Sequence, residues 1–330
     1  MKVTITGGAG FIGRKLAERL LGANSLIDAK GNNAAIEKLT LVDVAAPPPE
    51  LADDPRVAVM TGNIADPKLL NDAIPADTDS VFHMAAVVSA GAEEDFDLGM
   101  SVNMDATREI LEIARSHGTC PRIVFASSAA AFGGDMPAVL QDMTAPTPQT
   151  SYGTQKVIGE LLVHDYSRKG FVDGRTLRFP TVVVRPGKPN KAASTFASSI
   201  IREPLQGQRA VCPVTPQSRM WMSSPRAILH NVIHAHNLDG AAFGNSRTVS
   251  LPGFVVSIGD MAKALTEVAG KSVSDRIDWQ PDDFIQRIVD GWPPEFETTR
   301  ANAMGFIGDT DMRDVIRGFI EDELGGEFQA

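Results

Sequence analysis

Tyr152 and Lys156 are the residues whose types and spacing most directly suggest chemistry. They stand four residues apart in the segment SYGTQK, so on a helix both side chains lie on the same face. An unperturbed tyrosine titrates near about 10, and a neighbouring ammonium group lowers that pKa by stabilising the phenolate. The pair is therefore a candidate proton acceptor. Ser128, the second residue of a serine pair that ends an apolar run upstream, can supply a hydroxyl that orients a substrate oxygen.

A glycine pattern near the N-terminus is typical of a phosphate-binding turn. An apolar, β-branched run at 2–6 leads into three glycines spaced three residues apart, and a helical pattern follows. Such glycines allow a tight turn and a close approach of the backbone to a pyrophosphate, and the helix N-terminus attracts the anion. We therefore expect a dinucleotide cofactor at this turn. The residues expected to contact it are Gly7, Gly10, Phe11, Ile12 and Gly13.

Asp43 ends the next long strand pattern, where a carboxylate can accept hydrogen bonds from an adenosine ribose. It lies further from the glycines than the usual ~20 residues. A polar, Asn- and Gly-rich stretch at 22–37 accounts for the excess and is interpreted as a surface insertion. The segment 44–46 offers no cation for a 2′-phosphate, so NAD is favoured over NADP. The alternative is a strand-end Asp43 that merely caps a turn.

The elements that must position these residues alternate along the first half of the chain. Short apolar runs are separated by helical patterns that begin at Phe11, extend from about Glu94 to Ser116, and extend from about Tyr152 to Arg168. This alternation predicts βαβ units and a parallel sheet with helices on its faces, the doubly wound Rossmann class of α/β fold. The predicted strands are 2–6, 39–43, 57–60, 80–85 and 122–128.

The alternation of strand and helix patterns becomes less regular after Arg178, where prolines become frequent and the segments become shorter. We therefore expect an NAD-binding domain at 1–180 and a smaller α/β domain at 181–330 that mainly binds substrate. Some segments of the second half, such as 224–250, are expected to return to the first domain.

The composition excludes several classes of function. The 330 residues carry a net charge of −10, so the chain lacks the basic surface that binds nucleic acid or anionic lipid. Cys120 and Cys212 are far apart, and the histidines lack metal-ligand spacing, so neither a disulfide framework nor a metal site is expected. The sequence shows no secretory signal pattern and no long apolar run, so a cytoplasmic location without membrane association is expected.

Motifs in both halves of the chain resemble those of extended short-chain dehydrogenases/reductases, the family of sugar-nucleotide epimerases, dehydratases and sugar-acid dehydrogenases. They occur in the family's order along the chain. The matching motifs are TGGAGFIG at 6–13, GNIAD at 62–66, HMAA at 83–86, SVNMDAT at 101–107, SSAAAFGG at 127–134, YGTQK at 152–156 and LRFPTVVVRPG at 177–187.

This resemblance implies roles for individual residues. Ser128, Tyr152 and Lys156 would be catalytic, and Tyr152 and Lys156 would also contact the cofactor. The family more often has Asp at the position of Asn63, and this difference affects only the contact that residue 63 would make with the adenine. His83, within HMAA, is expected to be structural. The further residues implied for the cofactor are Asn63 and Ile64 beside the adenine, Ala85 along its length, Asn103 holding the strand-end loops, and Pro180 near the nicotinamide.

The segments 182–207 and 219–227 are similar to four-carbon sugar-acid dehydrogenases. That similarity implies oxidation at C2 of a sugar acid, with D-erythronate as the expected substrate and NAD as the hydride acceptor. Arg185 and Arg219 are candidate anchors for the substrate carboxylate, because a guanidinium pairs with such anions in a bidentate manner. A surface salt bridge is the alternative for Arg185. The residues expected to bind substrate are Ser128, Tyr152, Thr181, Arg185 and Arg219.

The sequence bears on three alternative functions. A dehydratase needs an acid and a base directly after the serine, and here Ser128 is followed by three alanines at 129–131. A 4-epimerase of UDP-sugars uses the same Tyr/Lys chemistry, and Arg219 stands where epimerases bind the diphosphate, so this alternative stays open. A regulatory NAD-binding protein without chemistry is disfavoured by the presence of all three catalytic residues. Similar proteins form homodimers through the two helices that flank the fifth strand, so a homodimer is expected.

Overall fold

The computed structural model describes residues 1–187, 194–293 and 295–329. Contacts within the chain divide these residues into two compact units, each described here by itself. The first unit comprises 1–131, 150–178 and 229–249, and the second comprises 132–149, 179–228 and 250–330. The first unit thus leaves out 132–149 and 179–180 of the expected 1–180 segment, and it takes in 229–249, which lies within the segment 224–250 expected to return to it.

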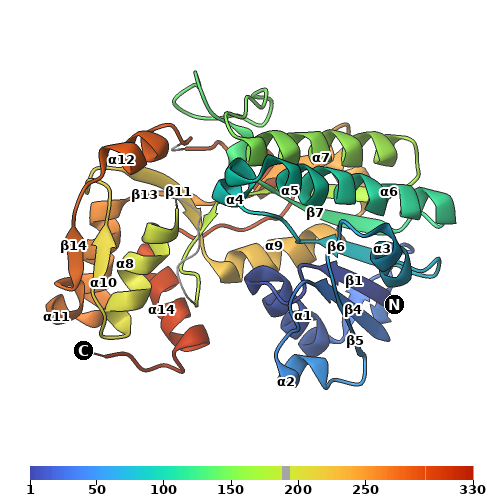
Figure 1. Ribbon diagram of the computed structural model, residues 1–330, viewed down its shortest axis with the longest axis horizontal. Helices are drawn as coiled ribbons and strands as arrows, with labels where there is room; N and C mark the ends of the chain where they lie inside the picture. The colour runs from blue at the N-terminus through green and yellow to red at the C-terminus, as the bar shows by residue number, and fades with distance from the viewer. Residues whose placement is uncertain (188–193, 294, 330) are drawn as a thin grey trace. The chain divides into compact units, whose positions relative to one another are not determined.

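The first unit is built on a seven-stranded sheet with the order β12-β8-β7-β6-β1-β4-β5 (Figure 1). β1 pairs in parallel with β4 on one side and with β6 on the other, so the chain reverses its direction across the sheet beside β1. In sheets of this kind, ligands bind at the carboxyl ends of the strands near that reversal. The strands are β1 (Lys2–Thr6), β4 (Lys38–Asp43), β5 (Val57–Thr61), β6 (Ser80–His83), β7 (Arg122–Ser128), β8 (Asp173–Phe179) and β12 (Thr248–Ser250).

The strands predicted from the apolar runs are present, with one shorter than expected. β6 ends at His83 instead of residue 85, because its neighbour β1 ends at Thr6, whose carbonyl accepts a last hydrogen bond from the Met84 amide. The mainly apolar interior of the other strands reflects burial on both faces, as expected for a parallel sheet. The helices of this unit are α1 (Phe11–Ala23), α2 (Pro49–Ala52), α3 (Pro67–Ala73), α4 (Ser89–Glu94), α5 (Phe96–Gly99), α6 (Ala106–His117), α7 (Ser151–Arg168) and most of α9 (Pro225–Asn237).

The helix expected from about Glu94 to Ser116 is not continuous. Asp95 accepts a 2.9 Å hydrogen bond from the Leu98 amide and starts a new helix there. A wider π-helical segment, Met100–Asp105, then joins α5 to α6. Such segments arise where a side chain or backbone group needs an extra residue in the turn.

The insertion at 22–37 contains a small antiparallel hairpin of β2 (Ser25–Ile27) and β3 (Asn33–Ala35). Asn237 accepts a 3.0 Å hydrogen bond from the Ile27 amide, which fixes the hairpin to α9. The residues at its tip, 29–33, are exposed, as a surface insertion should be.

The second unit has its own apolar core, to which α8, α10 and α14 and the short strands β10, β11, β13 and β14 contribute. β11 pairs with β9 in parallel and with β13 in antiparallel orientation. Its strands are β9 (Thr181–Val182), β10 (Ala210–Cys212), β11 (Arg219–Ser223), β13 (Phe254–Ser257) and β14 (Ile277–Trp279). Its helices are α8 (Thr195–Leu205), α10 (Ile258–Ala269), α11 (Lys271–Ser274), α12 (Asp283–Asp290), α13 (Thr299–Ala303) and α14 (Met312–Glu323).

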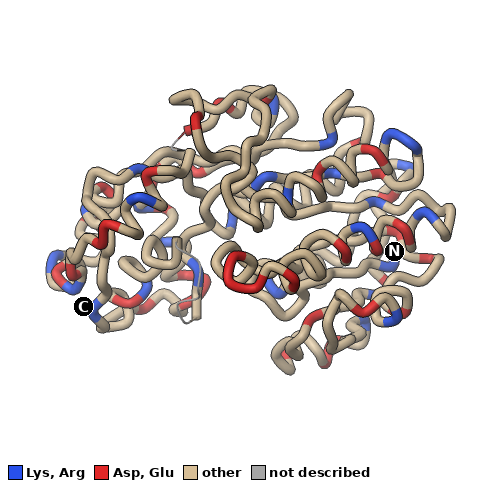
Figure 2. The backbone as a smooth tube through the Cα atoms, turned by 45° about the horizontal axis from the view of Figure 1, so that its top comes forward, with Lys and Arg blue, Asp and Glu red and all other residues tan. Residues whose placement is uncertain are grey.

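Acidic and basic positions are interspersed along the helices and loops of both units (Figure 2). The 41 acidic side chains outnumber the 31 basic ones. Within the ranges that the structure describes, no helix is both long enough and apolar enough to cross a membrane.

Candidate active site

The helix α7 begins directly before Tyr152. Thr150 caps it by accepting a 3.1 Å hydrogen bond from the Gly153 amide, which satisfies one of the free donors of the first turn. Tyr152 therefore lies in the first turn and Lys156 one turn later, and the Lys156 Nζ lies 5.6 Å from the centre of the Tyr152 ring. The predicted pair is thus brought together on one face.

Lys156 is buried beside the carboxyl end of β7. Its Nζ donates a 2.8 Å hydrogen bond to the Ala126 carbonyl and lies 4.8 Å from the centre of the Phe125 ring. Burial lowers the pKa of Lys156 to about 7, and the negative charge of Glu160 opposes that shift. An ammonium in this position favours the ionised form of a neighbouring phenol.

The two serines at the end of β7 have different surroundings. Ser127 is buried, and its Oγ donates a 2.5 Å hydrogen bond to Glu160. Ser128 is half-buried, and its Oγ accepts a 3.1 Å hydrogen bond from the Ala130 amide. Successive side chains of a strand point to opposite faces, so a single step along β7 separates a structural serine from one that can meet a substrate.

The glycine turn is compact enough to require glycine at its ends. A Cβ on Gly13 would lie 2.0 Å from the Gly7 carbonyl oxygen, and a Cβ on Gly7, which has a φ of +73°, would lie 2.7 Å from the Ala85 amide nitrogen. Gly10 caps α1 without a side chain, so Phe11 and Ile12 open the helix with their amides available to an anion. The turn therefore fits the pyrophosphate of a dinucleotide.

Asp43 lies at the end of β4, next to this turn. Its Oδ2 accepts hydrogen bonds of 3.1 Å from the Ala9 and Gly10 amides, and its Oδ1 accepts one of 3.2 Å from the Ala45 amide. The carboxylate thus holds the glycine turn as well as standing at the strand end where a ribose would lie.

The other residues expected along the cofactor lie at the ends of neighbouring strands. Asn63 is exposed and Ile64 is buried in the loop after β5, and Ala85 lies in the loop after β6. Asn103, in the π-helical segment, exchanges hydrogen bonds of 2.8 and 3.0 Å with the backbone of Val87, which fixes the loop after β6.

His83 is buried between two hydroxyl groups. Its Nδ1 lies 2.6 Å from the Thr6 Oγ1, and its Nε2 lies 2.9 Å from the Thr107 Oγ1. Burial, with a smaller contribution from Lys156, lowers its pKa to about 3. A histidine held neutral in this way connects β1, β6 and α6.

The residues expected to contact the nicotinamide and the substrate from the C-terminal half belong to the second unit. Pro180 precedes β9, and Thr181 is the first residue of that strand. Arg185 is half-buried, and its Nε donates a 3.1 Å hydrogen bond to the Val182 carbonyl. Part of the segment 182–207, namely 188–193, lies outside the described residues.

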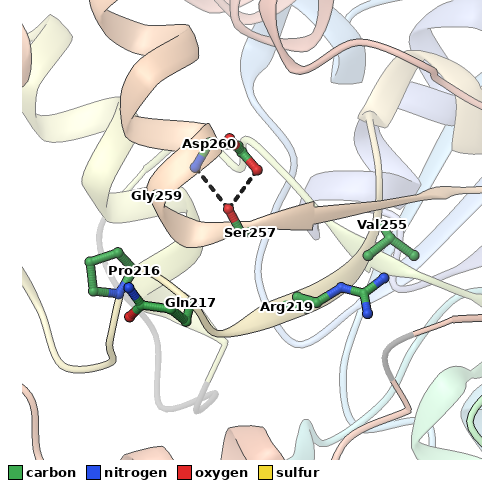
Figure 3. Close-up of a pocket in the computed structure, with 7 residues that line it drawn as sticks. All are labelled: Pro216, Gln217, Arg219, Val255, Ser257, Gly259 and Asp260. Atoms are coloured by element: carbon green, nitrogen blue, oxygen red, sulfur yellow. Dashed lines mark hydrogen bonds between the residues drawn. The ribbon is translucent and has the colours of Figure 1, made fainter.

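Arg219 lines an open pocket of about 560 Å³ in the second unit (Figure 3). It starts β11, opposite Ser257 of β13, and its Nη2 lies 3.4 Å from a carboxylate oxygen of Glu295. Asp260, in the first turn of α10, accepts a 2.6 Å hydrogen bond from the Ser257 Oγ. Arg219, one of the two candidate arginines, thus lines a pocket in the described part of the second unit.

Sequence reasoning missed Glu160, Arg178 and Phe125. Glu160 accepts hydrogen bonds from Ser127 and Arg178, and the Phe125 ring centre lies 4.8 Å from the Lys156 Nζ. The spacing of Lys156 and Glu160, four residues along a predicted helix, is the signal that could have identified the carboxylate.

The comparison with known families agrees with this geometry. A profile of the NAD-dependent epimerase/dehydratase family matches residues 3–224, which include the glycine turn, Ser128, Tyr152 and Lys156. The chain belongs to this family.

Two relatives within the epimerase/dehydratase family match nearly the whole chain. D-erythronate dehydrogenase of Cupriavidus necator is 52% identical, with 98% of each chain covered. D-erythronate dehydrogenase of Haemophilus influenzae is 47% identical, with 98% of this chain and 100% of the relative covered.

Solved structures of the same fold are also similar. A nucleoside-diphosphate-sugar epimerase from Agrobacterium tumefaciens has a TM-score of 0.94 and 42% identity, covering 100% of this chain and 96% of its own. L-threonine 3-dehydrogenase from Trypanosoma brucei, with a TM-score of 0.84 and 24% identity over 100% and 99% of the two chains, shares the fold. The Rossmann class predicted from the sequence is therefore confirmed.

Proposed function

We propose that this protein is an NAD-dependent dehydrogenase that oxidises D-erythronate at C2 to the 2-oxo acid. The observation that carries the chemistry is the buried Lys156 beside Tyr152, with the half-buried Ser128 at the end of the adjacent strand. The substrate is supported by the two relatives of 52% and 47% identity that carry this activity in their names.

The glycine turn and Asp43 would hold the cofactor. The backbone of Gly7–Gly13 would receive the pyrophosphate, and the Asp43 carboxylate would accept hydrogen bonds from the adenosine ribose. NAD, when bound, supplies the hydride acceptor. Asn63, Ile64, Ala85, Asn103 and Pro180 are the further residues that we propose for this site.

The three catalytic residues would have separate roles at the substrate hydroxyl. The Ser128 Oγ and the Tyr152 Oη orient the C2 hydroxyl, and Tyr152 takes its proton. Lys156 stays in place through its bond to the Ala126 carbonyl, and its charge stabilises the phenolate before the proton moves.

We propose that the second unit contributes the residues that recognise the substrate. A guanidinium group matches a carboxylate through two parallel hydrogen bonds, and Arg219 lines a pocket in that unit. Its bond to Glu295 is long, at 3.4 Å, and both side chains are exposed, so an incoming carboxylate can compete for it. Thr181 and Arg185 are further candidates, although the Arg185 Nε is already bonded to the Val182 carbonyl.

An epimerase acting on nucleotide sugars, with UDP-sugars as the expected class, is the second candidate function. It is favoured by the solved structure of 42% identity whose name describes a nucleoside-diphosphate-sugar epimerase. Arg219 fits this function as well, because guanidinium also pairs with a diphosphate.

One assay separates the two functions. The purified protein is mixed with NAD and D-erythronate, and NADH absorbance is followed; the same protein is then mixed with UDP-glucose, and the products are separated by chromatography. Net NADH formation with the sugar acid is expected. Isomerisation of the UDP-sugar without net NADH, together with no reaction of D-erythronate, would replace the dehydrogenase with the epimerase.

We further propose that the enzyme is a cytoplasmic homodimer assembled through α6 and α7. These helices lie side by side in the first unit (Figure 1). The outer side of α7 carries Leu161, which is 64% exposed, and Phe96 and Leu98 of α5 are exposed as well. Apolar side chains exposed on neighbouring helices are typical of a surface that a second copy covers.

A further inference from the structure

Three consecutive residues of β7 hold the catalytic helix. The Phe125 ring lies against Gly159 so closely that a Cβ there would be 2.6 Å from the Phe125 Cζ. The Ala126 carbonyl accepts the hydrogen bond from Lys156, and the Ser127 Oγ donates to Glu160. Ser128 is the next residue along the strand, so contacts that fix Ser127 also fix the position of Ser128.

Glu160 is in turn bound by Arg178 of β8. The Arg178 Nε lies 2.9 Å from Oε1 and its Nη2 lies 2.6 Å from Oε2, a bidentate arrangement. Both residues are under 10% exposed. Buried charges persist only with such partners, and breaking the pair would leave one of them uncompensated.

The buried cluster contains two positive groups and one negative group. Lys156 and Arg178 are cations, and Glu160 lies one helical turn after Lys156 on α7 and accepts hydrogen bonds from Arg178. A single charge within several ångströms in a buried site moves the titration of its neighbours by about one pH unit or more. The Glu160 carboxylate therefore acts on Lys156, which in turn lies beside the Tyr152 ring.

The other titratable groups around α7 are neutral, are paired with another charge, or lie at least partly exposed. His83 of β6 is buried and stays neutral, since its pKa is lowered to about 3. Glu93 of α4 accepts a hydrogen bond from the Ser151 amide at the exposed start of α7, and Glu112 of α6 binds Tyr166 near its other end. The remaining charged residues of the elements that pack on α7 are Glu94, Asp97, Asp105, Arg108, Glu109, Arg115 and His117, which are exposed or half-buried, and Arg122, which pairs with Asp173.

We propose that Glu160 and Arg178 are a positioning pair for the Tyr152–Lys156 couple. They fix the end of β7 beneath α7, and their opposite charges set the pH at which the couple titrates. The proposal rests on the proposed role of Tyr152 as proton acceptor, but it does not depend on the identity of the substrate.

Each change in the pair has a definite sign. Glu160→Gln removes a negative charge, so the site becomes more positive and loses its protons at lower pH. Arg178→Gln removes a positive charge, so the site keeps its protons to higher pH. The double variant removes both charges and should return the titration close to its original pH. A pair with only a packing role would not give opposite shifts that cancel.

The titration of Tyr152 can be observed directly. The chain contains two tyrosines, so Tyr166→Phe leaves Tyr152 as the sole one. The near-ultraviolet absorbance of its phenolate is followed against pH in the full-length protein without substrate or NAD. Asp165→Asn, which removes an exposed charge from the same helix, is the matched control and should leave the midpoint unchanged.

The expected result is a midpoint shift of about one unit downward for Glu160→Gln and upward for Arg178→Gln, with the double variant near the parent. Glu160→Asp keeps the charge and should keep the midpoint despite its shorter side chain. Shifts of the same sign in both single variants, or shifts no larger than that of Asp165→Asn, would overturn the proposal. If Glu160→Gln does not fold, Arg178→Gln is compared with the double variant. The midpoint of the double variant should then be lower than that of Arg178→Gln, because it additionally lacks the negative charge of Glu160. A failure of D-erythronate oxidation would leave this titration unaffected.

Discussion

The Nζ of Lys156 donates its hydrogen bond to Ala126, the residue two positions before Ser128 on the same strand. The cation that would stabilise the phenolate is thus fixed to the strand that carries the substrate-orienting hydroxyl. The relative placement of the three catalytic groups therefore depends on contacts between α7 and β7.

Tyr152→Phe keeps the aromatic ring and removes the hydroxyl that takes the proton. We expect kcat for D-erythronate oxidation to fall by about 10²- to 10⁴-fold, the usual contribution of a general base. NAD affinity, measured by calorimetry, should stay within about a factor of three, because the loss concerns the chemical step. Tyr166→Phe is the control, since the Tyr166 hydroxyl binds Glu112, and it should retain turnover. Wild-type turnover in Tyr152→Phe would contradict the mechanism.

Asp43 should determine the preference for NAD over NADP. Asp43→Asn removes the charge that repels a 2′-phosphate, while its amide oxygen can still accept from the Ala9 and Gly10 amides. The ratio of kcat/KM for the two cofactors should narrow by about tenfold, which corresponds to about 1.4 kcal/mol. Asp43→Ala should also narrow this ratio. It should in addition lower the Tm, because the loss of the carboxylate releases the glycine turn. Equal use of both cofactors by the unmodified enzyme would refute this assignment.

Gly13→Ala places a Cβ 2.0 Å from the Gly7 carbonyl oxygen, a backbone atom that cannot move aside cheaply. We expect a stability loss of about 1–3 kcal/mol, typical of overpacking, and NAD binding that calorimetry no longer detects. Gly22→Ala, in the same helix, meets nothing within 4 Å and should instead stabilise the protein by about 0.5–1 kcal/mol. Unaltered NAD affinity in Gly13→Ala would show that the turn does not bind the cofactor.

The two buried histidines should make the fold sensitive to acid. The pKa values of His83 and His236 are lowered from 6.5 to about 3, chiefly by burial. Between these pH values the unfolded chain binds protons that the folded chain does not, so the stability that is complete above pH 6.5 is lost as the pH falls toward 3. His236→Gln, whose amide can still reach Ser80, should flatten the pH dependence by about 1.4 kcal/mol per pH unit in urea unfolding. If the unfolding free energy of variant and parent changed equally with pH, His236 would not be neutral in the folded protein.

Leu161→Glu places a charge on the outer side of α7. If α6 and α7 form the dimer interface, burying this charge without a partner should favour the monomer at micromolar concentration, as measured by light scattering after size exclusion. Val211→Glu changes another exposed apolar residue, in the second unit, and should leave the mass unchanged. A monomeric parent protein would remove the basis for this prediction.

Residue types and local spacing were sufficient to predict the glycine turn, Asp43 and the Tyr152–Lys156 pair. Each depends on one strand, turn or helix, and therefore on short-range geometry. Glu160 and Arg178 could not be paired in this way, because their contact depends on β8 lying beside β7 beneath α7. Which of Ser127 and Ser128 is structural and which can meet a substrate could not be predicted either, because this depends on which face of β7 meets the helix.

The interruption of the helix expected from about Glu94 to Ser116 has a different cause. The apolar pattern from Glu94 to Ser116 is helical almost throughout, and nothing in its period distinguishes an α-helix from a π-helical turn. The departure follows from Asp95, which caps a new start, and from Asn103, whose side chain reaches the Val87 backbone across space.

The hairpin of β2 and β3 also offers a practical opportunity. Its base is secured by Asn237 and by a hydrogen bond from Arg122 to the Ile27 carbonyl, whereas its tip around Gly31 meets nothing within 4 Å of an added Cβ. The tip is closed by hydrogen bonds from the Lys30 and Asn32 amides to Asp28, and exposed tips of this kind accept inserted sequence. An epitope or a fluorophore attachment site placed between Lys30 and Asn32 would let the enzyme be immobilised or imaged through an internal position.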